Sequence, residues 1–200
     1  MMIKKFGAAA VALLSLGACA TGDVEIPPVA QVTQKPVTTI EEGKVLGLEL
    51  TSSVASSPLL EKAEKQLGRQ LVTMLGKGNF TKVVKIDQPH DYKLAAVIAD
   101  FETINPRLSA LGELVSDTAG IEAGQVVSEL AVKVDLQDAA GGGGSITKFN
   151  VKGGIPGVVS DTATKNLAIQ QTALNVSIAL TCINEGNSSE SNVAAMCAGF

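Results

Sequence analysis

Residues 126–151 read VVSELAVKVDLQDAAGGGGSITKFNV, and this stretch decides the fold class. Apolar side chains stand at every second position from Leu130 to Leu136, and they alternate with Glu129, Ala131, Lys133, Asp135 and Gln137. This alternation is typical of a β-strand with one buried and one solvated face. The glycines at 141–144 interrupt it, as expected of a hairpin turn, before residues 146–151 form a partner strand. We predict a β-hairpin with a mobile tip at 139–145.

Two helices are predicted outside this hairpin. In the first, Ser57 can cap the N-terminus, Pro58 suits the first turn, and Gly76 and Gly78 end the helix. Its apolar residues recur at helical spacing: Leu60, Ala63, Leu67, Leu71, Met74 and Leu75. The second helix begins from a cap at Ser160 or Asp161 and ends at Gly186. We expect its apolar side to carry Ala163, Leu167, Gln170, Leu174 and Ile178, widened by Ala173, Val176, Leu180 and Ile183.

Three further strands are predicted at 45–50, 80–86 and 94–104, followed by a polar, glycine-spaced segment at 105–124. The element order is then β-α-β-β-β-β-α. We expect an α+β fold in which two helices cover one face of a mainly antiparallel sheet. The predicted divisions are a signal peptide at 1–18, a proline-containing tether at 19–43, a domain at 44–186 and a C-terminal tail at 187–200.

The N-terminal segment has the layout of a secretory signal. Lys4 and Lys5 precede an apolar run at 6–16, which is shorter than the ~20 residues of a membrane-spanning helix. The following LGAC (16–19) resembles the lipobox of bacterial lipoproteins, in which the cysteine is acylated and the chain is cut before it. In such proteins, residues like Ala20 and Thr21 after Cys19, in place of Asp, imply the outer membrane. The alternative is an ordinary secretory signal, ending at or near Ala20, in which Cys19 is incidental.

The charge balance argues against nucleic acid as a partner. The chain has 16 basic and 20 acidic side chains, and removal of residues 1–18, which include two lysines and no acid, leaves it more acidic. Nucleic-acid binding requires clustered Lys and Arg that displace counterions. The expected partners are the membrane, through the lipid on Cys19, and an envelope protein.

Cys182 and Cys197 are the other cysteines. In an oxidising periplasm an even pair most often forms a disulfide, and closing a loop of about fifteen residues contributes roughly 3 kcal/mol in the chain-entropy model. Two buried free thiols are the alternative. Two thiols and the distant His90 do not supply the four ligands of a zinc site, so we expect neither a metal nor another cofactor.

A family resemblance lies in residues 44–184. The helix LLEKAEKQLGRQLVTMLGKG (59–78) is followed by NFTKVV (79–84), the hairpin at 127–154 and a closing helix. This order resembles a plan shared by uncharacterised lipoprotein families, the penicillin-binding-protein activator LpoB and the curli secretion lipoprotein CsgG. The resemblance implies a periplasmic lipoprotein domain. A pore like that of the secretion channel is not expected, because 105–124 is too short for several membrane strands of about 9–11 residues.

Two groups of ionisable residues are candidates for catalysis. Asp91 could orient His90 as a base, but the sequence has no Gly-x-Ser-x-Gly nucleophile motif. Asp100 and Glu102 share one strand face at roughly 6–7 Å, a separation that any two acids two positions apart would have. One Tyr and no Trp leave few aromatic surfaces for stacking on sugars or bases.

We therefore expect no enzyme. The predicted protein is an outer-membrane-anchored periplasmic lipoprotein that binds, scaffolds or regulates another envelope component, with contact sites at 105–124 and 139–145. The alternative function is a small-ligand carrier or envelope hydrolase that uses Asp100 or His90.

Overall fold

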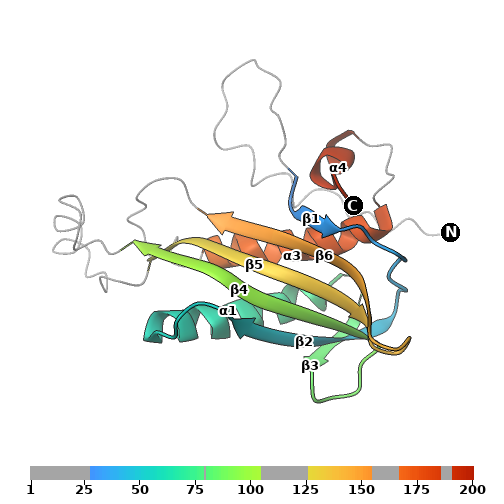
Figure 1. The fold of residues 1–200 in the computed structure, drawn as a ribbon, viewed down its shortest axis with the longest axis horizontal. Helices are drawn as coiled ribbons and strands as arrows, with labels where there is room; N and C mark the ends of the chain where they lie inside the picture. The colour runs from blue at the N-terminus through green and yellow to red at the C-terminus, as the bar shows by residue number, and fades with distance from the viewer. Residues whose placement is uncertain (1–27, 79, 105–125, 155–166, 186–190) are drawn as a thin grey trace.

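The computed structural model describes residues 28–78, 80–104, 126–154, 167–185 and 191–200, whose strands form one six-stranded sheet. The strands are β1 (Gln31–Gln34), β2 (Lys44–Ser52), β3 (Phe80–Lys85), β4 (Tyr92–Ile104), β5 (Val126–Asp138) and β6 (Gly144–Gly154). The helices of this part of the chain are α1 (Pro58–Leu75), α3 (Leu167–Glu185) and α4 (Ser191–Met196). Figure 1 shows α1 and α3 together behind one face of the sheet, with α4 near β1 at its edge.

The sheet is mixed, with strand order β1-β6-β5-β4-β2-β3. The pairs β1–β6, β6–β5 and β5–β4 are antiparallel, whereas β2 is parallel to both of its neighbours. The α+β class and the mainly antiparallel sheet agree with the prediction. The predicted order β-α-β-β-β-β-α is wrong, because it omits β1 and α4. The first parallel pair follows from α1, which returns the chain from the end of β2 to the start of β3.

The second parallel pair depends on Gly47. Only residues 86–91 connect β3 to β4, although β2 lies between these two strands. His90, in this connection, stands over β2, and a Cβ at position 47 would be 2.7 Å from its Cγ atom. Because Leu46 and Leu48, on either side, pack with the core, His90 lies on the sheet face away from the helices. The missing side chain at position 47 thus makes room for the short crossing.

The domain begins earlier than predicted. β1 pairs with β6, placing Val32 opposite Phe149, and Ala30 and Ile40 are buried in the core. Residues 28–43, assigned to the tether, are therefore part of the folded domain, while 19–27 lie outside the described residues. A strand of four residues is too short for its alternation to be recognised. Pro36 follows this edge strand at a place where a proline is tolerated.

Helix α1 confirms its prediction. The Ser57 side chain accepts a hydrogen bond from the Leu60 N–H, and Pro58 occupies the first turn. The helix ends at Leu75, and Gly76 is its C-cap. Its buried residues are Leu60, Ala63, Leu67, Leu71 and Leu75, and Met74 packs against the core from a half-buried position.

The buried side of α3 agrees in part with the predicted one. The buried residues are Ala168, Ile169, Thr172, Ala173, Val176, Ala179, Leu180, Cys182 and Ile183. Ala173, Val176, Leu180 and Ile183 are therefore buried as predicted. The rest of the predicted side is not, since Leu167 and Gln170 are exposed and Leu174 and Ile178 are half-buried. Residues 167–184 include no charged side chain, so polarity does not distinguish the two sides. The expected caps Ser160 and Asp161, with Ala163, lie outside the described residues.

Helix α3 lies directly against β6 at Gly153. A Cβ at this position would overlap the Ala168 carbonyl oxygen and the Thr172 hydroxyl. Thr172 is fully buried, and its Oγ1 lies 2.8 Å from Ala168 O and 3.2 Å from Leu130 O. The backbones of helix and strand therefore approach more closely than any residue with a side chain at position 153 would permit.

The C-terminal end of α3 holds α4 and, through it, the start of β1. Cys182 in α3 and Cys197 after α4 form a disulfide with a Cα–Cα distance of 5.2 Å. Met196 O, in α4, accepts a hydrogen bond from Val29 N at 3.0 Å.

Asn184 holds a second N-terminal segment to the same end of α3. Its Oδ1 accepts from Ile40 N at 2.7 Å, and its Nδ2 donates to Ile40 O at 2.9 Å. We call these three connections, the Cys182–Cys197 disulfide, the Val29–Met196 bond and the Asn184–Ile40 pair, the terminal clamp. They place Val29 against α4 and Ile40 against the last turn of α3, although both residues are far from these helices in sequence.

No helix of the described residues is long and apolar enough to cross a membrane.

Gly153→Ala is expected to destabilise the domain by about 1–3 kcal/mol, the usual cost of overpacking a closed core. Gly144→Ala in the same strand is the matched control, because a Cβ there meets no atom within 4 Å. Urea unfolding followed by circular dichroism measures both. Equal midpoints for the two variants would contradict the close contact between α3 and β6.

Candidate functional site

One face of the sheet carries no helix among the described residues. α1 and α3 both lie on the opposite face (Figure 1). The side chains that alternate with the core residues of β2, β4, β5 and β6 point away from these helices. We call this surface the open face. Its residues are Glu49, Thr51, Lys93, Ala95, Val97, Asp100, Glu102, Glu129, Ala131, Lys133, Asp135, Gln137, Lys148, Asn150 and Lys152.

Opposite charges pair between neighbouring strands of the open face. Lys93 Nζ lies 2.8 Å from Glu49 Oε2, and Lys148 Nζ lies 3.7 Å from Asp135 Oδ2. A third ion pair joins Lys152 to Glu129. Such partly exposed pairs contribute little to stability, because water and salt screen them. Their larger consequence is a pattern of charges of both signs across neighbouring strands.

Lys133 lies at the centre of this pattern and is unlike the other open-face lysines. Within the described residues it has no ion-pair partner, and its side chain is exposed. Its neighbours across the sheet, Val97 on β4 and Asn150 on β6, are uncharged. Ala95 and Ala131 nearby are too small to cover its ammonium group. Lys133 is therefore available to an anionic group of another molecule.

Acidic residues gather at one end of the open face. The Glu129 carboxylate, hydrogen-bonded to Lys152, raises the pKa of that lysine, and the charges of Asp100 and Glu102 raise it further. In the part of the chain that the structure describes, no three His, Cys, Asp or Glu side chains are placed to hold a metal ion.

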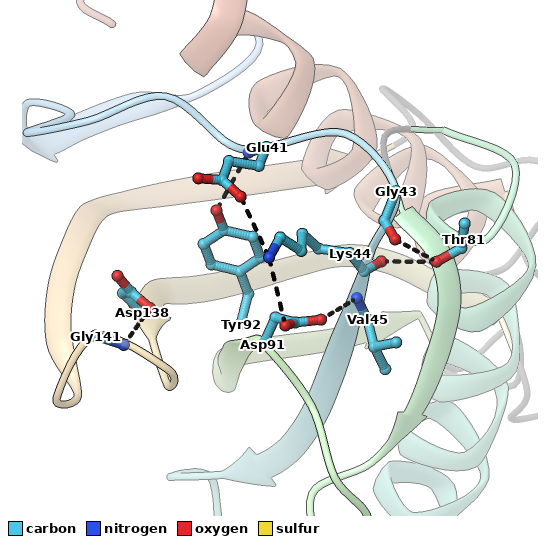
Figure 2. A network of polar contacts seen from close by, with 9 residues as sticks. All are labelled: Glu41, Gly43, Lys44, Val45, Thr81, Asp91, Tyr92, Asp138 and Gly141. Atoms are coloured by element: carbon cyan, nitrogen blue, oxygen red, sulfur yellow. Dashed lines mark hydrogen bonds and ion pairs between the residues drawn. The ribbon is translucent and has the colours of Figure 1, made fainter.

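A second polar cluster joins the strand ends beside the β5–β6 turn (Figure 2). Asp91 Oδ2 accepts a hydrogen bond from Val45 N at 2.8 Å, and its Oδ1 lies 3.8 Å from Lys44 Nζ. Lys44 Nζ also lies 3.2 Å from Glu41 Oε2. The hydrogen bond that Lys44 donates to the Glu41 carboxylate, with the charges of Glu41 and Asp91, raises the pKa of Lys44. Glu41 N in turn donates to the Tyr92 hydroxyl at 3.2 Å, so the cluster holds the entry to β2 against the start of β4.

The hairpin tip at 139–145 has a defined turn, where the sequence predicted a mobile segment. Gly142 and Gly143 have φ angles of 103° and 80°, which favour glycine. The Asp138 carboxylate accepts from Gly141 N at 2.7 Å, as Figure 2 shows. Asp91 O accepts from Ala139 N at 2.9 Å, and this bond ties the tip to β4. The other predicted contact segment, 105–124, lies outside the described residues.

The structure does not pair His90 with Asp91 as a catalytic base and its orienting acid. His90 Nδ1 lies 2.7 Å from the carbonyl oxygen of Gln88, so this nitrogen carries the proton and donates it. The Asp91 carboxylate is occupied by Val45 and Lys44. His90 serves instead as the residue that passes over Gly47.

Asp100 is an exposed residue of the open face. Its Oδ1 accepts a hydrogen bond from the neighbouring Phe101 N at 2.9 Å. Asp100 and Glu102 both lie near Lys152, as the shared effect on its pKa indicates. Both acids are exposed on a charged surface, whereas a carboxyl group that acts as a general acid is commonly buried.

Sequence reasoning found the strands of the open face and missed the polar cluster. The alternation at 129–137 already separates Lys133 and Asp135 from the core. Which charges pair, and which is left unpaired, depends on the register of four strands. The contact of Asp91 with Val45 joins residues 46 positions apart, and no local pattern reports it.

Comparison with known proteins yields a structural likeness without a family. No family model and no curated protein matches the chain. Two solved structures, both of the PelC dodecamer from Paraburkholderia phytofirmans and one of them a point variant, are similar to it. The variant has 15% identity and a TM-score of 0.47, covering 74% of this chain and 95% of its own. The other has 14% identity and a TM-score of 0.45, covering 74% and 96%. These values are too low to support an inference about function.

Asp91→Ala is expected to cost about 1–3 kcal/mol in free energy of unfolding, because Val45 N–H loses its acceptor. Asp87→Ala is the matched control in the same connection, since Asp87 is exposed. Asp91→Asn, which keeps a side-chain oxygen, should recover most of the loss. Thermal or urea unfolding of the three variants measures this, and an Asp91→Ala variant as stable as Asp87→Ala would show that the cluster contributes nothing to the fold.

Proposed function

We propose that this protein is a lipid-anchored binding or scaffold component of the bacterial cell envelope. Cys19, acylated after cleavage of residues 1–18, holds it on the periplasmic face of the outer membrane, and the open face binds a protein partner. The observation that carries the proposal is the short distance in sequence between the lipobox at 16–19 and the first clamped residue, Val29.

Only residues 20–27 then separate the acylated Cys19 from the folded domain. Residues 20–27 span at most about 30 Å when fully extended. Stable attachment requires at least two acyl chains, each contributing about 0.8 kcal/mol per buried methylene, and a lipoprotein cysteine carries them. The domain is held close to the bilayer, where its partner would be found in the envelope.

The open face supports a protein as the partner class. It carries charges of both signs on neighbouring strands, and such patterns select partners by complementary charge. At its centre Lys133 offers a cation that has no ion-pair partner among the described residues. The open face includes no aromatic side chain on which a sugar ring could stack.

Site-specific photocrosslinking in native envelopes tests this function. A photoreactive residue at Val97, beside Lys133, is expected to capture one defined envelope protein. The same probe at Thr73, on the exposed side of α1, should not capture it. Lys133→Glu is expected to abolish the crosslink at 97, whereas Lys62→Glu, an exposed charge reversal on α1, should leave it unchanged.

The anchor is checked in the same cells. Metabolic palmitate labelling is expected for the native protein and absent from Cys19→Ser, which should also lose the crosslink by leaving the membrane. An unlabelled native protein would contradict the anchor. Crosslinks that are equal at 97 and 73, or insensitive to Lys133→Glu, would contradict the role of the open face.

A further inference from the structure

The edge of the sheet at β1 differs in charge from the rest of the molecule. Residues 28–40 include one charged side chain, Lys35, and residues 191–200 include none, whereas 18% of all residues in the chain are charged. The opposite edge, at β3 and the connection after it, exposes Lys82, Lys85 and Asp87. The edge at β1 therefore exposes few charged side chains, whereas the edge at β3 exposes several.

β1 and α4 form one continuous surface at this edge. Val29 N bonds to Met196 O, and the position of a Cβ on Gly199 is 3.5 Å from Val32 Cγ2. Ala194 and Ala198 are exposed on the outside of this surface, and Figure 1 shows α4 beside β1. We call the surface made by residues 28–40 and 191–200 the uncharged edge.

The most exposed large apolar side chain among the described residues also lies on the uncharged edge. Val37 is 72% exposed, although its own N–H is fixed by a hydrogen bond to Ile146 O at 3.0 Å. Transfer of such an exposed apolar side chain from water into an apolar phase lowers the free energy. The hydrogen-bonded backbone already holds Val37 outward, in position for this transfer. Lys35, two positions earlier, adds a cation that suits anionic phospholipid.

The tether emerges from this same edge, because Pro28 directly precedes the clamped Val29. With Cys19 in the bilayer, a tether of at most about 30 Å keeps the uncharged edge at high effective concentration near the lipid surface. A surface with Lys35 as its one charged side chain is also desolvated at lower cost than the ion-paired open face.

We propose that the uncharged edge rests on the phospholipid surface of the membrane that holds Cys19. The inference depends on the lipid anchor proposed above and adds an orientation to it. The sheet stands edge-on, with β1 toward the membrane and β3 away from it, and the open face is accessible from the side. A bilayer is the occupant because the segment that leads to the acylated Cys19 joins this surface at Pro28.

Tryptophan fluorescence tests the orientation, since the chain has no Trp of its own. Ala194→Trp and Val37→Trp are placed one at a time in the full-length acylated protein, bound to vesicles of phosphatidylethanolamine and phosphatidylglycerol with brominated acyl chains. Both are expected to show a blue-shifted emission and loss of intensity by bromine quenching. Gln88→Trp, exposed at the far edge, is the control and should show neither.

A second measurement uses the unaltered side chains, because an introduced Trp itself favours lipid. Amide exchange across residues 192–198 is expected to be slower in the vesicle-bound acylated protein than in soluble Cys19→Ser. Sedimentation with vesicles checks the anchor separately. Protein that sediments, but shows equal quenching at 194 and 88 and unchanged exchange, would overturn the orientation and leave the anchor intact. Acylated protein that fails to sediment would overturn the anchor itself.

Discussion

Helix α3 can lie on β6 because position 153 carries no side chain, and the rest of the domain depends on this contact. The buried Thr172 hydroxyl fills the contact, within hydrogen-bonding distance of the helix carbonyl of Ala168 and the strand carbonyl of Leu130. With its axis fixed against the sheet, α3 presents Cys182 and Asn184 at the sheet edge. These two residues hold α4 and the segment that leads into β2. A contact made by one glycine thereby determines where the N-terminal segment enters the fold.

The two surfaces left free by this arrangement have different composition. The open face is polar because polar and apolar side chains alternate along its strands. Three of its lysines form ion pairs, and Lys133 has no such partner within the part of the chain that the structure describes. The uncharged edge is poor in charge because α4 and β1 lie side by side there. Residues 28–40 and 191–200 together include one charged side chain, Lys35. In the proposed function the two surfaces have separate roles, with the edge toward the lipid and the open face toward a protein.

The parts of the fold that the sequence predicts are those with local signals. α1 has a cap, a proline at its start and an apolar stripe, and the strand around 130–136 has a clean alternation, so both are recovered. β1 is missed because four residues are too few to show the alternation of buried and exposed side chains that is typical of a strand. The orientation of α3 is predicted only in part, because residues 167–184 include no charged side chain that would mark the solvated side. The parallel pairing of β2 with β4 depends on the connection at 86–91, which crosses β2 over Gly47. No local sequence pattern indicates this crossing.

The sequence predicts the candidate site, like the fold, only where the signal is local. Alternation identifies which side chains of β5 are solvated, but the unpaired state of Lys133 depends on the register of the neighbouring strands. Asp91 attracts notice in the sequence as a partner for His90, and its carboxylate instead binds Val45 N–H, an interaction that no spacing rule anticipates. Asp100 stands at an exposed place, as a charged residue late in an apolar strand commonly does.

The account depends most on the claim that residues 29–40 belong to the folded domain and are not a free tether. Hydrogen exchange at the amides of Val29, Val37 and Ile40, resolved by NMR, tests it directly, since each donates a defined hydrogen bond. All three are expected to be protected, and reduction of the Cys182–Cys197 disulfide should release Val29 while Val37 and Ile40 stay protected. Exchange of all three at the rate of an unstructured peptide in the oxidised protein would contradict the account.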